Sequence, residues 1–129
     1  MDLFINYSNH PMSKWSEKQL NAAKEMADKL IDIPFPQIDP EATEDDIISL
    51  ANEQLEEIEK KYGDNDTFIT IHIAGELTYT AYFVSMVNRH HYNIACVSST
   101  SKRNTVDNPD GTKTVKFEFV KFRLYVTTA

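Results

Sequence analysis

The hydrophobic pattern of this chain switches repeatedly between short apolar runs and helix-like apolar stripes, and this alternation constrains the fold most strongly. Residues 67–73 form a β-branched, apolar run without alternation, which is typical of a strand covered on both faces. One helical pattern precedes this run, another follows it, and residues 94–97 form the next apolar run. Strand, helix and strand in this order predict parallel strands that are joined by right-handed crossovers.

The predicted helices are marked by capping residues and apolar spacing. Ser16 and Gln19 match a capping box, and Thr43 is a suitable N-cap for a second helix that ends before Gly63. The apolar stripe of this second helix consists of Ile47, Ala51, Leu55 and Ile58. A third helix is predicted from about residue 78 to residue 90, with an apolar side formed by Ala81, Val84 and Val87.

The last part of the chain is strand-like and contains a strong turn signal. Residues 108–111 read Asn-Pro-Asp-Gly, and we expect residues 113–125 to pair with a short strand near Thr105 and Val106, in a hairpin at about 104–126. The predicted fold is therefore α/β. It is a small Rossmann-like three-layer sandwich with a mostly parallel sheet and an added C-terminal β-hairpin, in one domain over residues 1–129.

Charge is distributed unevenly along the chain. The net charge is −7, which counts against binding duplex DNA or RNA through its phosphates. Residues 1–98 hold 7 Lys or Arg against 17 Asp or Glu, whereas residues 99–129 hold 6 against 3. Such a basic last quarter can bind a compact anionic ligand. The ordinary alternative is a solvated hairpin with surface lysines.

Other features of the composition exclude several classes of protein. Apolar runs of 18 or more residues and a basic leader are absent, so neither a membrane span nor a secretory signal is expected. The single cysteine, Cys96, excludes an intramolecular disulfide and a Cys-rich zinc site. The histidines form no HExxH-type group, so we expect no metal and no cofactor. A cytoplasmic protein is the resulting prediction.

Polar loops are predicted after three of the strands, at residues 6–10, 75–78 and 98–104. Ligands of open parallel sheets bind beyond the carboxyl ends of the strands, where such loops lie. The third loop has four consecutive hydroxyl residues followed by Lys102 and Arg103, which together supply donors and fixed positive charge for a phosphate. A solvated turn of the same composition is the alternative.

The remaining candidates in these loops have both structural and functional interpretations. Gly75 precedes a helix N-terminus that can hold an anion, and Glu76 either binds a ribose hydroxyl or caps this helix, with capping favoured. His10 is a candidate acid or base in its loop, whereas His72 is expected to be a satisfied, partly buried strand residue. Tyr7 can stack on a base, although core packing is the commoner fate of such a residue.

Four segments of the chain carry a family resemblance: FINYSNHP at residues 4–11, AGE at 74–76, STSKR at 99–103 and FEFVKFRLY at 117–125. Together they resemble small stand-alone CRISPR-associated proteins of type III systems. These are CARF-like (CRISPR-associated Rossmann fold) proteins that are related to ring nucleases. Members of this group often have a different residue where this chain has Glu76.

The resemblance implies a homodimer that binds a cyclic oligoadenylate across its two-fold axis. It also implies metal-independent opening of this cyclic ligand, in which a ribose 2′-hydroxyl attacks the adjacent phosphate and leaves a 2′,3′-cyclic phosphate end. The implied catalytic residues are His10, Ser99 and Arg103. The ligand-binding residues that it implies are Asn6, Ser8, Gly75, Glu76, Thr100 and Ser101, and the loop positions add Tyr7, Asn9, Thr78 and Lys102. The alternatives are a protein that binds the cyclic ligand without cleaving it, and an interaction module whose basic hairpin contacts a larger complex.

Overall fold

The computed structural model describes residues 1–128, and Ala129, the last residue of the predicted domain, lies outside the described residues. One sheet is formed by β1 (Leu3–Ser8), β2 (Lys29–Pro34), β3 (Ile69–Ala74), β4 (Ile94–Asp107) and β5 (Lys113–Leu124). The strand order is β2-β1-β3-β4-β5, in which β5 alone is antiparallel to its neighbour. The predicted α/β fold with a mostly parallel sheet and a C-terminal hairpin is confirmed.

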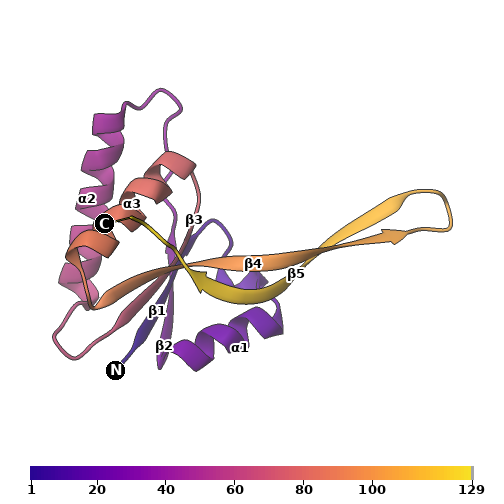
Figure 1. Ribbon diagram of the computed structural model, residues 1–129, viewed down its shortest axis with the longest axis horizontal. Coiled ribbons are helices and arrows are strands. Elements are labelled where there is room, and N and C mark those ends of the chain that lie inside the picture. The colour runs from indigo at the N-terminus through magenta and orange to yellow at the C-terminus, as the bar shows by residue number, and fades with distance from the viewer. Residues whose placement is uncertain (129) are drawn as a thin grey trace.

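Helices cover both faces of the sheet and complete the three layers (Figure 1). The short 3-10 turn η1 (Met12–Lys14) and helix α1 (Glu17–Met26) lie on one face, whereas α2 (Glu44–Tyr62) and α3 (Leu77–His90) lie on the other. None of the helices in residues 1–128 combines the length and the apolar character that crossing a membrane requires.

The two faces of the central strands differ in chemistry. Successive side chains of a strand alternate between the two faces, so each face carries every second residue. Leu3, Ile5 and Tyr7 of β1 point toward α2 and α3 and belong to the main apolar core, as do the three isoleucines of β3. The alternate positions of these strands point toward α1 and are partly polar. They are Phe4, Asn6 and Ser8 of β1, and Thr70, His72 and Ala74 of β3.

Hydrogen bonds at the helix starts confirm Ser16 and Thr43 as N-caps, but only the helix that begins after Thr43 has a complete capping box. The Ser16 hydroxyl accepts from the Gln19 backbone N–H at 3.2 Å, and Thr43 with Asp46 forms a complete capping box. The predicted apolar stripe of α2 is buried as expected. In α3 the stripe is displaced: Ala81 is exposed, and the buried residues are Tyr79, Thr80, Phe83, Val84 and Val87. The large aromatic side chains of α3 occupy the face that contacts the sheet, which leaves Ala81 toward solvent.

The hairpin is longer than predicted, and it projects from the body (Figure 1). Residues 98–104, predicted as a loop, are a continuous part of β4, and each of them pairs with a residue of β5. A register shift between Thr100 and Ser101 leaves Val120 of β5 without a partner in the ladder. We call residues 101–118, which lie beyond this bulge, the arm. All of them except Asn108 are exposed.

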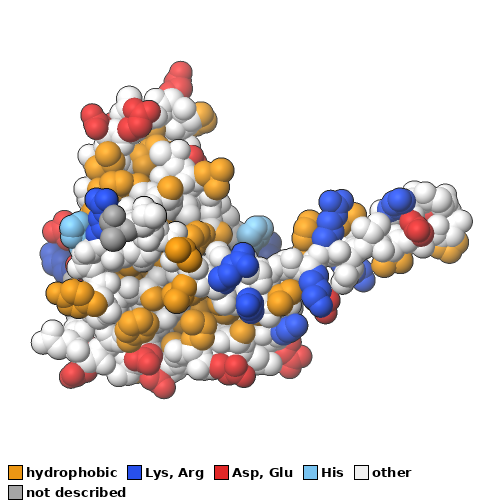
Figure 2. Space-filling view, in the orientation of Figure 1, with side chains coloured by type: hydrophobic (Ala, Val, Ile, Leu, Met, Phe, Trp, Pro, Cys, Tyr) orange, Lys and Arg blue, Asp and Glu red, His pale blue; other side chains and the backbone are white. Residues whose placement is uncertain are grey.

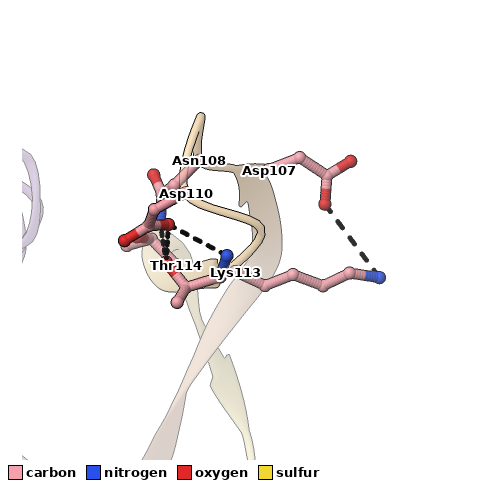
Figure 3. Close-up of polar contacts among 6 residues, drawn as sticks. Asp107, Asn108, Asp110, Lys113 and Thr114 are labelled. Atoms are coloured by element: carbon pink, nitrogen blue, oxygen red, sulfur yellow. Dashed lines mark hydrogen bonds and ion pairs between the residues drawn. The ribbon is translucent and has the colours of Figure 1, made fainter.

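The turn at the end of the arm agrees with its sequence signal. Gly111 has a φ of 87°, a left-handed conformation that favours glycine. The Asn108 side chain donates to the Thr114 hydroxyl at 2.8 Å across the turn, and Lys113 lies 4.0 Å from the Asp107 carboxylate (Figure 3). These polar contacts close the turn without any apolar core.

Candidate ligand-binding groove

A groove of about 1010 Å³ lies at the carboxyl ends of β1 and β3, between the η1–α1 segment and the base of the arm. This is the edge of the sheet at which parallel α/β folds bind ligands. The groove is lined by Ser8, His10, Lys14, Trp15, Ser16, Lys18, Gln19, His72, Ala74, Ser99, Ser101, Asn104, Lys116, Phe117, Glu118 and Phe119. Its volume is at the upper end of the range of about 300–1,000 Å³ for small-molecule sites.

The groove is basic although the body of the protein is acidic. Lys14, Lys18 and Lys116 line it against one carboxylate, Glu118, which accepts a hydrogen bond from the Asn104 amide at 3.2 Å. Figure 2 shows Lys and Arg side chains along the hairpin, whereas Asp and Glu side chains gather at the margins of the body. Ammonium groups and serine hydroxyls around one cavity can bind an anion that has several oxygen atoms, such as a phosphodiester.

A buried hydrogen-bond network lies beneath the groove and is centred on Asn6, which is 1% exposed. Its Nδ2 donates to the His10 carbonyl oxygen at 2.8 Å and to Asp32 Oδ1 at 2.9 Å. A carbonyl and a carboxylate can only accept, so the orientation of the amide is fixed. Asn6 Oδ1 therefore accepts from the Ser8 hydroxyl at 2.8 Å and from His72 Nδ1 at 2.9 Å.

This network fixes the tautomer of His72. Because Nδ1 donates to Asn6 Oδ1, the proton of the neutral imidazole is on Nδ1 and Nε2 carries a free lone pair. The residue is 3% exposed, and burial together with the charge of His10 lowers the pKa of His72 to about 4. His72 Nε2 has no hydrogen-bond partner among the described residues, so the prediction of a satisfied histidine is correct for Nδ1 only.

Several predicted site residues meet at the groove. Ser8, His10, Ser99 and Ser101 line it, and Asn6 lies directly below in the network. The described residues contain no group of three or more His, Cys, Asp or Glu side chains that could hold a metal ion.

The residues of the predicted third loop are separated by their strand geometry. The Thr100 hydroxyl donates to the Lys121 carbonyl oxygen at 3.1 Å, and Lys102 and Arg103 are exposed on the arm. Arg103 lies opposite Phe117 in the hairpin and is not among the residues that line the groove. The basic side chain that the arm contributes to the groove is instead that of Lys116.

Other predicted ligand contacts have structural roles. Tyr7 is fully buried in the core, where its hydroxyl lies 2.7 Å from that of Tyr79, so its ring has no free face for a base. A Cβ atom at Gly75 would collide with the Phe35 ring, which shows that this glycine makes room for a core side chain. Glu76 caps α3 by accepting from the Tyr79 N–H at 2.8 Å, and backbone hydrogen bonds with Tyr79 and Thr78 lower its pKa.

Asn9 and Thr78 are exposed and lie outside the groove lining. The groove residues that the sequence did not indicate include Lys14, Trp15 and Lys18. They come from the turn and helix that follow β1, a segment whose polar face resembles any solvated surface. A usable signal was present in β1, where polar Asn6 and Ser8 occupy one face of an otherwise apolar strand.

Comparison with known proteins shows the family of this chain. No curated protein sequence matches it. A structure of Enterococcus italicus Csm6 bound to cyclic hexa-2′-fluoro-hexa-dAMP is similar, with a TM-score of 0.45 and 11% sequence identity over 88% of this chain. The match covers 35% of the Csm6 chain, so this protein spans about a third of the length of that relative. The model of the family described as the uncharacterized protein MJ1673 family matches residues 2–123, and the chain belongs to this family.

Proposed function

We propose that this protein binds a cyclic oligoadenylate in the groove, as a homodimer, and opens it as a metal-independent ring nuclease in type III CRISPR signalling. The observation that carries the proposal is the basic groove at the strand ends, where Lys14, Lys18 and Lys116 surround serine hydroxyls. The resemblance of four sequence segments to CARF-like proteins supports a cyclic oligoadenylate as the anion. The ligand presents a phosphate at every nucleotide, which suits several separate lysines along one groove.

The arm supports the homodimer. A two-stranded hairpin alone in water is only marginally stable. The arm also exposes apolar side chains that a second copy would cover, such as Phe117 (72% exposed) and Val106 (51% exposed). Its lysines and arginine complement the acidic body of a second copy. Isologous pairing of two copies would also match a cyclic ligand with two-fold symmetry.

Cleavage requires in-line geometry and stabilisation of phosphate charge more than it requires a strong base. The 2′-oxygen forms a bond to phosphorus while the bond from phosphorus to the 5′-oxygen breaks. The proton of the 2′-hydroxyl leaves to a base, and the 5′-oxygen gains a proton, which yields a 2′,3′-cyclic phosphate and a 5′-hydroxyl. His10 is the proposed proton carrier at the groove, and the Ser99 hydroxyl with the lysines stabilises the charge on phosphate.

Incubation of labelled cyclic tetra-adenylate with the protein and EDTA tests this function. The expected result is linear product with a 2′,3′-cyclic phosphate end, which His10→Ala reduces and His90→Ala leaves unchanged. His90 is an exposed histidine at the end of α3 and serves as the matched control. Tight binding without product would replace the nuclease with a sequestering protein, and absence of binding to any cyclic oligoadenylate would overturn the whole proposal.

A further inference from the structure

We propose that His72 Nε2 accepts a hydrogen bond from a hydroxyl or amino group of the ligand, and that the Trp15 indole moves aside to admit this group. The inference rests on the proposed function, because it concerns the floor of the same groove. It assigns the two parts of a nucleotide to two parts of the site, with the phosphates at the lysines and the nucleoside at His72.

The first support is the unpaired acceptor itself. Native proteins pair nearly all buried polar atoms, so each unpaired one calls for an explanation. His72 is 3% exposed, lines the groove and has Nε2 without a partner in residues 1–128. The cause is the network on its other side: Asn6 holds the proton on Nδ1 and thereby leaves Nε2 as an acceptor.

The second support is the arrangement of aromatic rings around His72. Phe4, Trp15 and Phe122 have ring centroids at 6.5, 5.3 and 5.5 Å from that of the imidazole. Of these three, only Trp15 also lines the groove. Trp15 is partly exposed, follows the single turn of η1, and has one side-chain hydrogen bond, from Nε1 to the His10 carbonyl oxygen at 3.2 Å. Nε2 has almost no exposed surface, so a ligand reaches it by displacing this indole.

The third support is the chemistry of the acceptor. A phosphodiester oxygen has no hydrogen to donate, so the neutral imidazole Nε2 cannot bind it. The donors of an adenosine nucleotide within a cyclic oligoadenylate are the ribose 2′-hydroxyl and the adenine 6-amino group. His10 is the one titratable group whose charge acts on the pKa of His72. Asp32 hydrogen-bonds to Asn6 and is linked to His72 only through that side chain.

The first experiment uses Trp15, the single tryptophan of the chain, as the probe. Calorimetry establishes binding of cyclic tetra-adenylate to the wild-type protein, and the emission of Trp15 is then recorded at saturation in a catalytically impaired His10→Ala background. We expect a change of intensity and wavelength as the indole leaves the imidazole. Unchanged emission at saturating ligand would overturn the displacement of Trp15.

The second experiment compares His72→Phe with the matched control His90→Phe. Phenylalanine preserves a ring within the aromatic cluster but removes the acceptor, so affinity should fall about tenfold, whereas the control keeps wild-type affinity. Cyclic tetra-deoxyadenylate, which lacks the 2′-hydroxyl, and the cyclic tetramer of purine riboside, which lacks the 6-amino group, identify the donor. The analogue that lacks the donor should bind the wild type and His72→Phe equally.

Nitrogen-15 NMR of His72 in the wild-type protein removes any dependence on folding of the variant. On addition of cyclic tetra-adenylate, the Nε2 resonance should shift toward that of a hydrogen-bonded acceptor while Nδ1 stays protonated. Binding with an unchanged Nε2 resonance would overturn this inference and leave the proposed function intact. Absence of binding by calorimetry would overturn both.

Discussion

The network beneath the groove predicts that Asn6→Asp destabilises the fold by about 3–5 kcal/mol at pH 7, the range for a buried charge without its partner. Asn6 is 1% exposed, and its Nδ2 donates to Asp32 at 2.9 Å and to the His10 carbonyl at 2.8 Å. The substitution replaces this donor with an oxygen, so acceptors face one another. Two hydrogen bonds are lost as well, and each contributes about 0.5–3 kcal/mol, with the larger values for a charged partner such as Asp32.

Chemical denaturation at pH 7, followed by circular dichroism, measures this loss of unfolding free energy. Adding Asp32→Asn to Asn6→Asp returns a donor to the pair, so the double variant should be more stable than Asn6→Asp alone by about 1 kcal/mol or more. If Asn6→Asp loses less than about 1 kcal/mol, or if the second substitution rescues nothing, the amide is not oriented as described. The assigned tautomer of His72 would then also be wrong.

Three further predictions concern the groove, the arm and His72. Lys116→Ala should weaken binding of cyclic tetra-adenylate about ten- to a hundred-fold in calorimetry, the range for bonds to charged groups. Arg103→Ala should change it far less because Arg103 lies outside the lining, and equal losses would contradict the site. Phe117→Ser should shift the protein toward monomer in analytical ultracentrifugation, since Phe117 is 72% exposed on the proposed dimer arm, and an unchanged distribution would contradict that role. Burial lowers the pKa of His72 from 6.5 to about 4, so the unfolded chain binds more protons between these values. Stability should therefore fall by about 3 kcal/mol as the pH drops through this window. His72→Phe should flatten that part of a denaturation series, and an unaltered slope would show that other groups cause it.

Local signals predicted the body of the fold because each acts within a few residues. Thr43 and the spacing from Ile47 to Ile58 define α2 without reference to the rest of the chain. The position of Gly75 could not be interpreted in this way, because the side chain that it accommodates, Phe35, comes from a distant loop. Sequence showed that a small residue stands there, but not which group approaches it.

The hairpin itself was predicted correctly, but its extent was mispredicted for a different physical reason. Residues 98–104 lack the apolar alternation by which strands are recognised, because this part of β4 has no side chain in the apolar core. Hydroxyl residues such as Ser98 and Thr100 therefore predicted a loop, although both donate to carbonyl oxygens of the opposite strand. As a result Arg103, expected at a strand end, lies on the arm, and the groove has Lys116 in its place.

Under the proposed function, the two faces of the central strands divide stability and recognition between them. On the α2–α3 face, Ile69, Ile71 and Ile73 are fully buried among apolar neighbours, which is the arrangement that contributes most to folding. On the α1 face, Asn6 and His72 occupy positions where apolar residues would pack at lower cost. Helix α1 has 10 residues and leaves the carboxyl ends of these strands open to the groove. Asn6 holds His72 in one tautomer at the uncovered end of the sheet, at a cost in packing, and this leaves Nε2 as the acceptor that the proposed ligand contact requires.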